Sequence, residues 1–80
     1  MNLQRVEVQC YSGSSADERP RLVIVDGRKH SVLRLLSQST EQTVESKDWT
    51  TRFTVLTEES LIIELIRTTG GEWYLVSIKD

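Results

Sequence analysis

The fold is set by a strand pattern on each side of a hairpin turn, in the segment Leu22-Val23-Ile24-Val25-Asp26-Gly27-Arg28-Lys29-His30-Ser31-Val32. Aliphatic and β-branched residues dominate residues 21–25, as in a β-strand. The dipeptide Asp26-Gly27 suits a two-residue type I′ turn, which requires a positive φ at both central residues. We therefore predict an antiparallel hairpin whose returning strand covers residues 28–36. A helix over residues 31–38 is the weaker alternative.

Alternation of apolar and polar side chains with a period of two extends outward from this hairpin. It predicts further strands over residues 3–11, 49–57, 61–67 and 72–78, with turns over residues 57–60 and 68–71. In the first of these strands, Val6, Val8 and Cys10 share one face, and in the second, Phe53 and Val55 share one face.

Two further strands have faces that the alternation also predicts. In the returning strand of the hairpin, they are His30, Val32, Arg34 and Leu36 on one side and Ser31, Leu33 and Leu35 on the other. In the last strand, they are Trp73 and Leu75 on one side and Tyr74, Val76 and Ile78 on the other.

Residues 37–48 interrupt this pattern, because Val44 is the one apolar residue in the segment. A segment this polar has no apolar face to bury against a core. We therefore predict a polar, mobile loop over residues 37–48, within a single domain that covers residues 1–80. Loops of this length in compact domains carry function or are disordered.

Five or six short strands joined mainly by tight turns predict an all-β fold. A sheet of this size must curl to bury its apolar face, and closure also removes exposed strand edges. The expected architecture is a small curled antiparallel sheet or an SH3-like half-barrel of five to six strands. An OB-like barrel is the competing architecture, although that fold usually has more residues and an intervening helix.

The composition excludes several classes of protein. Hydrophobic residues form 38% of the 80-residue chain and charged residues 28%, which is typical of a globular domain rather than a disordered chain. The one cysteine, Cys10, excludes an internal disulfide, and together with the one histidine, His30, it falls short of the usual four-ligand zinc site. The apolar runs are too short for a membrane helix, and residues 1–5 lack the pattern of a secretory signal. We therefore expect a cytoplasmic protein with no cofactor, metal or membrane.

Several short phrases follow one another along the chain: Val8-Gln9-Cys10-Tyr11-Ser12-Gly13, Glu18-Arg19-Pro20, Arg52-Phe53-Thr54-Val55 and Gly71-Glu72-Trp73-Tyr74-Leu75. In this order they resemble a family of short bacterial proteins of unknown function, with the pattern V-x-x-Y-[SA]-G, E-R-P, R-x-F-x-V and G-x-W-x-L. The second half is also similar to the β-rich tail of some proteins related to Y-family DNA polymerases. The resemblance implies an all-β cytoplasmic bacterial domain linked to DNA repair or replication. The chain departs from the family at Ser37-Gln38-Ser39, where the family often carries a Trp.

Basic residues that are candidates for a binding surface gather mostly in the first half of the chain. Arg19 lies in the constrained phrase Glu18-Arg19-Pro20-Arg21. There it pairs with an internal carboxylate, offers its planar fork to a phosphate or an acidic partner, or is simply exposed to solvent. The other candidates are Arg21, Arg28, Lys29, Arg52 and the aromatic Trp49, which we expect to be partly exposed. Single-stranded nucleic acids bind where aromatic side chains lie beside a positive groove. The net charge of −2 argues against a dedicated nucleic-acid binder.

The strand pattern over residues 61–67 carries apolar residues on both faces. Its two predicted faces are Leu61, Ile63 and Leu65 on one side and Ile62, Glu64 and Ile66 on the other. A single-layer sheet of this size buries one face in its own core. Either this strand is central and covered on both sides, or a protein partner or a second copy of the chain covers Ile62 and Ile66.

No set of residues has the spacing of a catalytic site. Asp26, His30 and Ser31 supply the letters of a hydrolase triad, but neighbours in a strand such as His30 and Ser31 point to opposite faces. We therefore expect no enzyme and no small-molecule substrate. The first hypothesis is a non-catalytic protein-interaction module that uses the outer face of residues 61–67 or an exposed strand edge. The alternative is a nucleic-acid-associated module, in repair or replication.

Overall fold

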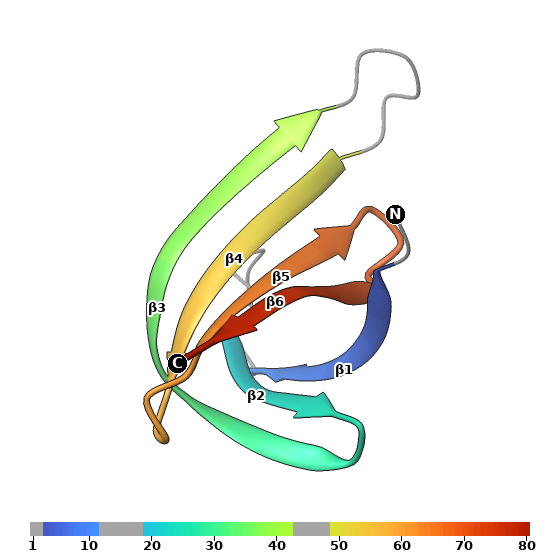
Figure 1. Cartoon of the computed structure of the whole chain (residues 1–80). Helices are drawn as coiled ribbons and strands as arrows, with labels where there is room; N and C mark the ends of the chain where they lie inside the picture. Colours follow the sequence, from blue (N-terminus) through green and yellow to red (C-terminus); the bar gives the residue numbers. More distant parts are fainter. Residues whose placement is uncertain (1–2, 12–18, 43–48) are drawn as a thin grey trace.

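The computed structural model describes residues 3–11, 19–42 and 49–80, and these residues form a small closed barrel of antiparallel strands (Figure 1). Its strands are β1 (Gln4–Cys10), β2 (Pro20–Val25), β3 (Arg28–Gln42), β4 (Trp49–Thr57), β5 (Ile62–Thr68) and β6 (Trp73–Lys79). Each strand pairs with the next one along the chain, and β6 pairs with β1. The predicted all-β fold is confirmed with six strands, and the pairing of β6 with β1 makes the barrel closed. Within the described residues, no helix is long and apolar enough to cross a membrane.

The predicted tight turns are confirmed by backbone geometry. Asp26 and Gly27 have φ values of 50° and 81°, and Val25 pairs with Arg28 across them. These values suit a type I′ turn, whose twist matches that of the flanking strands. Gly71, in the turn between β5 and β6, has a φ of 84°, a region that glycine enters without steric cost.

The core lies inside the barrel and is built from alternate residues of five strands. Its buried side chains are Val6, Val23, Val25, Phe53, Val55, Ile63, Leu65 and Trp73. The rings of Phe53 and Trp73 pack with their centroids 4.9 Å apart. The faces predicted for β1, β4 and β5 are therefore confirmed.

In the returning strand of the hairpin, the shared inner face of His30 and Val32 is confirmed, but the faces predicted beyond Val32 are wrong, because β3 contains two irregularities in its pairing with β4. Val32 faces Thr57 and Arg34 faces Leu56, so Leu33 is an extra residue on β3. Leu35 faces Val55 and Ser37 faces Thr54, so Leu36 is a second one. Each bulge shifts the alternation by one residue. As a result Leu35 packs against the core, whereas Leu33 and Leu36 are 62% and 44% exposed.

The loop predicted over residues 37–48 is wrong for its first half, because β3 continues to Gln42. Residues 37–42 pair in register with residues 49–54 of β4. Main-chain hydrogen bonds to a neighbouring strand hold this segment extended although it has no apolar side chain to bury. Residues 43–48 lie outside the described part of the chain.

A further irregularity, in the pairing of β5 with β6, corrects the predicted face of Ile78. The register shifts between Glu64 and Leu65, so Leu65 faces Leu75 and Ile63 faces Ile78. Ile78 therefore lies on the same side of the sheet as Leu75, at the end of the barrel. There it lines a depression together with Val25, His30 and Leu61.

Candidate functional site

A groove opens on the barrel surface where β2 and β3 separate. The last pair between these strands is Leu22 with Ser31, and from Val32 onward β3 pairs with β4 instead. The groove has a volume of about 670 Å³, and its lining residues are Tyr11, Arg19, Pro20, Val32, Leu33, Arg34 and Leu35. The bend that carries β3 from one partner to the next therefore creates the groove.

The wall of the groove opposite β3 is held by the backbone. The amide of Tyr11 donates a hydrogen bond to the carbonyl oxygen of Arg19 at 3.1 Å, just beyond the pair that Cys10 forms with Pro20. Pro20 is fully buried, so it anchors the start of β2 to the core. Tyr11 and Arg19 are thus placed on the rim by a fixed segment of main chain.

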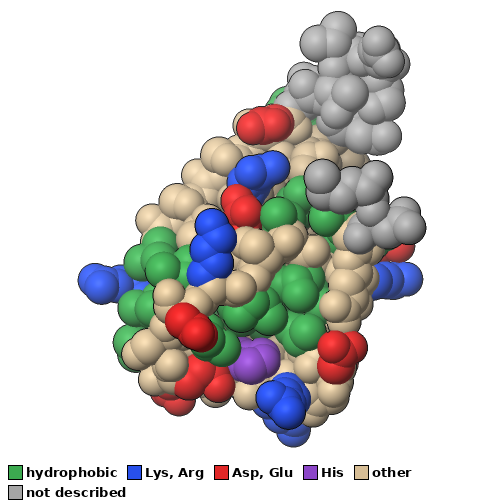
Figure 2. Space-filling model, viewed as in Figure 1, with side chains coloured by type: hydrophobic (Ala, Val, Ile, Leu, Met, Phe, Trp, Pro, Cys, Tyr) green, Lys and Arg blue, Asp and Glu red, His purple; other side chains and the backbone are tan. Residues whose placement is uncertain are grey.

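Large apolar side chains are exposed on both sides of the groove. Tyr11 is 56% exposed on one wall, and Leu33 is 62% exposed on the other. Leu36, the residue of the second bulge, lies three residues further along β3 and is also exposed. Figure 2 shows hydrophobic side chains gathered over the bend of β3. Single exposed apolar residues are ordinary, but a cluster beside a concave surface is typical of a binding site.

The upper half of β3, residues 32–42, also has an unpaired edge. Residues 33–42 pair with β4 on one side, and no described strand pairs with them on the other (Figure 1). Exposed edges in natural proteins usually carry several charges or a proline that discourage strand addition. Along residues 33–42 the charged residues are Arg34 and Glu41, and proline is absent. An extended segment from elsewhere can therefore reach the main-chain donors and acceptors of this edge.

The described lining of the groove carries two positive charges. Arg19 and Arg34 are exposed on opposite walls, and none of the described residues that line the groove is Asp or Glu. Within the described residues, neither guanidinium forms an ion pair. By contrast, Arg5 contacts Glu72 at 3.5 Å and Arg52 contacts Glu64 at 3.2 Å. The two groove arginines are therefore available to an anionic group on a ligand.

The other basic residues singled out in the sequence do not join them in one face. Arg21 donates a hydrogen bond to Gln9, and Arg28 lines the depression at the end of the barrel. Lys29 lies beside Glu58 and Glu59, so its surroundings are acidic. Arg52 is paired with a carboxylate on the outer face of β4. Of the predicted basic set, the structure places Arg19 alone in the groove and adds Arg34.

Trp49 is 49% exposed, as predicted, and lies at the start of β4 beyond the barrel core. Its main chain is bound to the turn after β5: its amide donates to Thr69 Oγ1 at 2.8 Å, and its carbonyl accepts from the same hydroxyl at 3.1 Å. Trp49 does not line the groove.

Ile62 and Ile66 lie on the outer face of β5, as predicted, but they do not form a continuous apolar patch. Glu64 lies between them on the same face, flanked by Thr54 and Ser77. Ile66 lies between Arg52 and Tyr74. The outer face of β5 is thus interrupted by polar and charged side chains.

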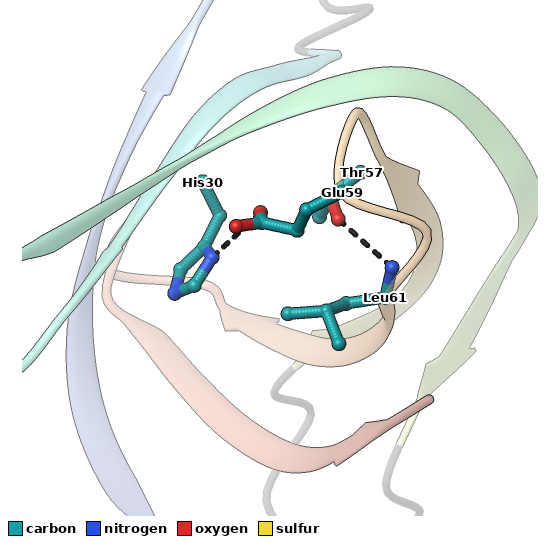
Figure 3. Close-up of polar contacts among 4 residues, drawn as sticks. All are labelled: His30, Thr57, Glu59 and Leu61. Atoms are coloured by element: carbon teal, nitrogen blue, oxygen red, sulfur yellow. Dashed lines mark hydrogen bonds and ion pairs between the residues drawn. The ribbon is translucent and has the colours of Figure 1, made fainter.

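His30, the one histidine, is buried and holds a turn in place (Figure 3). Its Nδ1 lies 2.8 Å from Glu59 Oε1, and it donates to this oxygen when the carboxylate is ionised. That hydrogen bond, with smaller contributions from the charge of His30 and from a hydrogen bond with Thr57, lowers the pKa of Glu59 from its ordinary value of 4.5. In the same turn, the buried Thr57 hydroxyl accepts from the amide of Leu61 at 3.0 Å.

The structure does not bring Asp26, His30 and Ser31 together as a hydrolase triad. Asp26 Oδ1 accepts a hydrogen bond from Gln4 Nε2 at 2.8 Å, and His30 contacts Glu59 instead. Ser31 is exposed, whereas His30 is buried. Within the described part of the chain, no group of three His, Cys, Asp or Glu side chains is placed to hold a metal ion.

Four residues of the site were missed by sequence reasoning: Tyr11, Leu33, Arg34 and Leu36. The available signal was the phrase Val32-Leu33-Arg34-Leu35-Leu36, because two pairs of adjacent apolar residues cannot both follow a period of two. Such a phrase indicates a bulge in a strand.

Comparison of the chain with models of protein families, with curated proteins and with solved structures gives no match.

Proposed function

We propose that this protein is a non-catalytic interaction module that binds an extended peptide segment of a protein partner along the unpaired edge of β3. The observation that carries the proposal is the coincidence of that edge with the groove that it borders. Residues 33–42 present main-chain groups with no described partner on one side, and the exposed Tyr11 and Leu33 lie at the end of this edge. In strand addition, main-chain hydrogen bonds supply affinity and side-chain pockets supply specificity.

The two bulges assign different roles to the two parts of the edge. Residues 37–42 pair regularly with β4, so their outer edge keeps the repeat that a new strand needs. The bulges at Leu33 and Leu36 break this repeat near the groove. The added segment therefore forms its ladder along residues 37–42 and places an apolar side chain in the groove.

A nucleic-acid ligand is less well supported than a peptide. The basic residues expected to form one surface lie on different parts of the barrel, and Arg52 is already paired with Glu64. Among the described residues that line the groove, Tyr11 is the one aromatic, and a single ring is no series of stacking platforms. An oligonucleotide is nevertheless the informative competitor in a binding experiment.

Selection from a displayed library of random peptides, followed by titration into the labelled protein, tests the proposal. We expect enriched peptides to shift the amide resonances of residues 33–42 and Tyr11. Leu33→Asp places a charge in the contact and should weaken binding about tenfold or more. Ile62→Asp is the matched control, because Ile62 is also exposed but lies on the outer face of β5. Absence of enrichment, or equal loss in both variants, would overturn the proposal.

A further inference from the structure

We infer that the segment bound at this edge is acidic near the groove, with its carboxylates placed on Arg19 and Arg34 and an apolar side chain between them. The inference rests on the proposed function and names the chemistry of the partner. It starts from a contrast of charge: the chain has a net charge of −2, yet the described residues that line the groove include two arginines and no Asp or Glu.

The two arginines differ from other arginines of the barrel in what they contact. Arg5 and Arg52 each contact a carboxylate on or beside a neighbouring strand. Within the described residues, Arg19 and Arg34 have no such neighbour, although both stand next to exposed apolar side chains. A guanidinium presents a planar fork of donors that matches a carboxylate in two parallel hydrogen bonds. The donors in the groove are thus of the kind that an Asp or Glu side chain satisfies.

The placement of the two arginines restricts where the acidic residues lie. Arg19 belongs to the wall formed by the segment before β2, and Arg34 belongs to β3 on the other side. A segment that passes between them can contact one arginine with each of two acidic side chains. Its apolar side chain then meets Tyr11 and Leu33, which are exposed on the two walls.

The opposite end of the edge carries the opposite charge. Glu41 is exposed near the end of β3, where a second carboxylate would be repelled. The acidic residues of the partner are therefore expected at its groove end, with neutral or basic residues beside Glu41. This polarity distinguishes the proposed ligand from a uniformly anionic polymer such as a nucleic acid.

Paired peptides provide the test. A peptide enriched by library selection is synthesised in its selected form and with Asn and Gln in place of Asp and Glu, and both forms are titrated at low and high salt. We expect the acidic form to bind about tenfold more tightly at low salt, and the difference to shrink as salt screens the charges. Arg19→Glu and Arg34→Glu should each weaken the acidic peptide about fivefold and leave the neutral one nearly unchanged.

Lys79→Glu is the matched control, because Lys79 is exposed at the end of β6 and does not line the groove. All three charge variants alter exposed side chains, and their amide spectra verify the fold before binding is measured. Equal binding of the two peptide forms at the β3 edge, with no effect of either arginine, would overturn this inference and leave the proposed function standing. Enrichment of no peptide would overturn both.

Two other occupants are outcomes of the same experiments. A single-stranded oligonucleotide that binds more tightly than the acidic peptide and depends on the same arginines would replace the inferred peptide with a nucleic acid. A dimer in sedimentation that Leu33→Asp dissociates would replace it with a second copy of the chain. A monomer that binds the acidic peptide and no oligonucleotide is the expected result.

Discussion

β3 has a lower half, residues 28–31, and an upper half, residues 32–42, and each pairs with a different strand along one edge. The two halves differ in what lies along their other edge. In the lower half, β2 pairs with residues 28–31, and the turn between β4 and β5 is hydrogen-bonded to the opposite edge at Ser31. There the amide of Glu58 donates to the carbonyl of Ser31 at 3.0 Å, and the carboxylate of Glu59 reaches His30. In the upper half, β4 pairs with residues 32–42, and no described strand covers the other edge.

With the proposed function, this difference assigns stability to one part of the strand and peptide binding to the other. The lower half buries His30 and pairs its Nδ1 within the barrel. The upper half exposes Leu33 and Leu36, and its outer main-chain groups have no described partner strand. Elements that bind partners are commonly drawn from the less stable parts of a fold.

The largest effect is expected from two leucines on β3 that are separated by Arg34. Leu35→Ala removes a side chain that packs against the core and should lower the free energy of unfolding by about 2 kcal/mol. Leu33→Ala removes an exposed side chain and should change it by less than about 0.5 kcal/mol. Urea unfolding of both variants measures the difference. Equal losses would mean that the two leucines share one face and that β3 has no bulge between them.

A smaller effect is expected in the turn that covers the lower half. Thr57→Val keeps the shape of a buried side chain but leaves the amide of Leu61 without its acceptor, which should cost about 1 to 2 kcal/mol. The matched control is Thr51→Val, because the hydroxyl of Thr51 meets that of Thr40 at an exposed site. Thermal unfolding reports both. A control as damaging as Thr57→Val would show that the turn contributes nothing special to the lower half.

The smallest effect is a change in pH dependence. Because the pKa of Glu59 is lower in the folded protein than its ordinary value of 4.5, the ionised carboxylate stabilises the fold. This contribution is present above the ordinary pKa and is lost as the pH falls through the lowered pKa. Glu59→Gln should therefore lose less stability on acidification than the parent, as measured by urea unfolding near neutral pH and again in acid, below the ordinary pKa of the carboxyl group.

Glu58→Gln is the control for this variant, because Glu58 lies in the same turn and the described part of the barrel gives its carboxylate no ion pair. Its stability should fall with pH as that of the parent protein does. Identical acid sensitivity in Glu59→Gln and in the parent would contradict the role given to the His30–Glu59 contact.

The sequence is sufficient for the parts of the fold that follow a regular period. The hairpin follows from the turn dipeptide Asp26-Gly27, and the buried faces of β4 and β5 follow from unbroken alternation. The continuation of β3 to Gln42 does not, because main-chain pairing with β4 holds residues 37–42 extended while their side chains are polar. Periodicity detects burial, and a strand without buried side chains gives no such signal.

Most of the candidate site could not be predicted from the sequence, for a related reason. Regular alternation places Leu33 on the same face as Leu35, and the bulge in β3 separates them. Arg19 and Arg34 line the same groove because of the place where β2 and β3 diverge, which is set by the closure of the barrel. A protein-interaction module that uses the outer face of residues 61–67 or an exposed strand edge stays a prediction, and the sequence does not say which strand has such an edge.

The most direct test of the account is amide hydrogen exchange along β3 in the free protein. In an antiparallel ladder, alternate residues of an edge strand direct their amides toward the neighbour and the others outward. We predict that amides of residues 37–42 exchange in alternation, with slow ones facing β4 and fast ones at the unpaired edge. Slow exchange at every consecutive amide of residues 37–42 would mean that another segment covers this edge, and it would contradict the central claim.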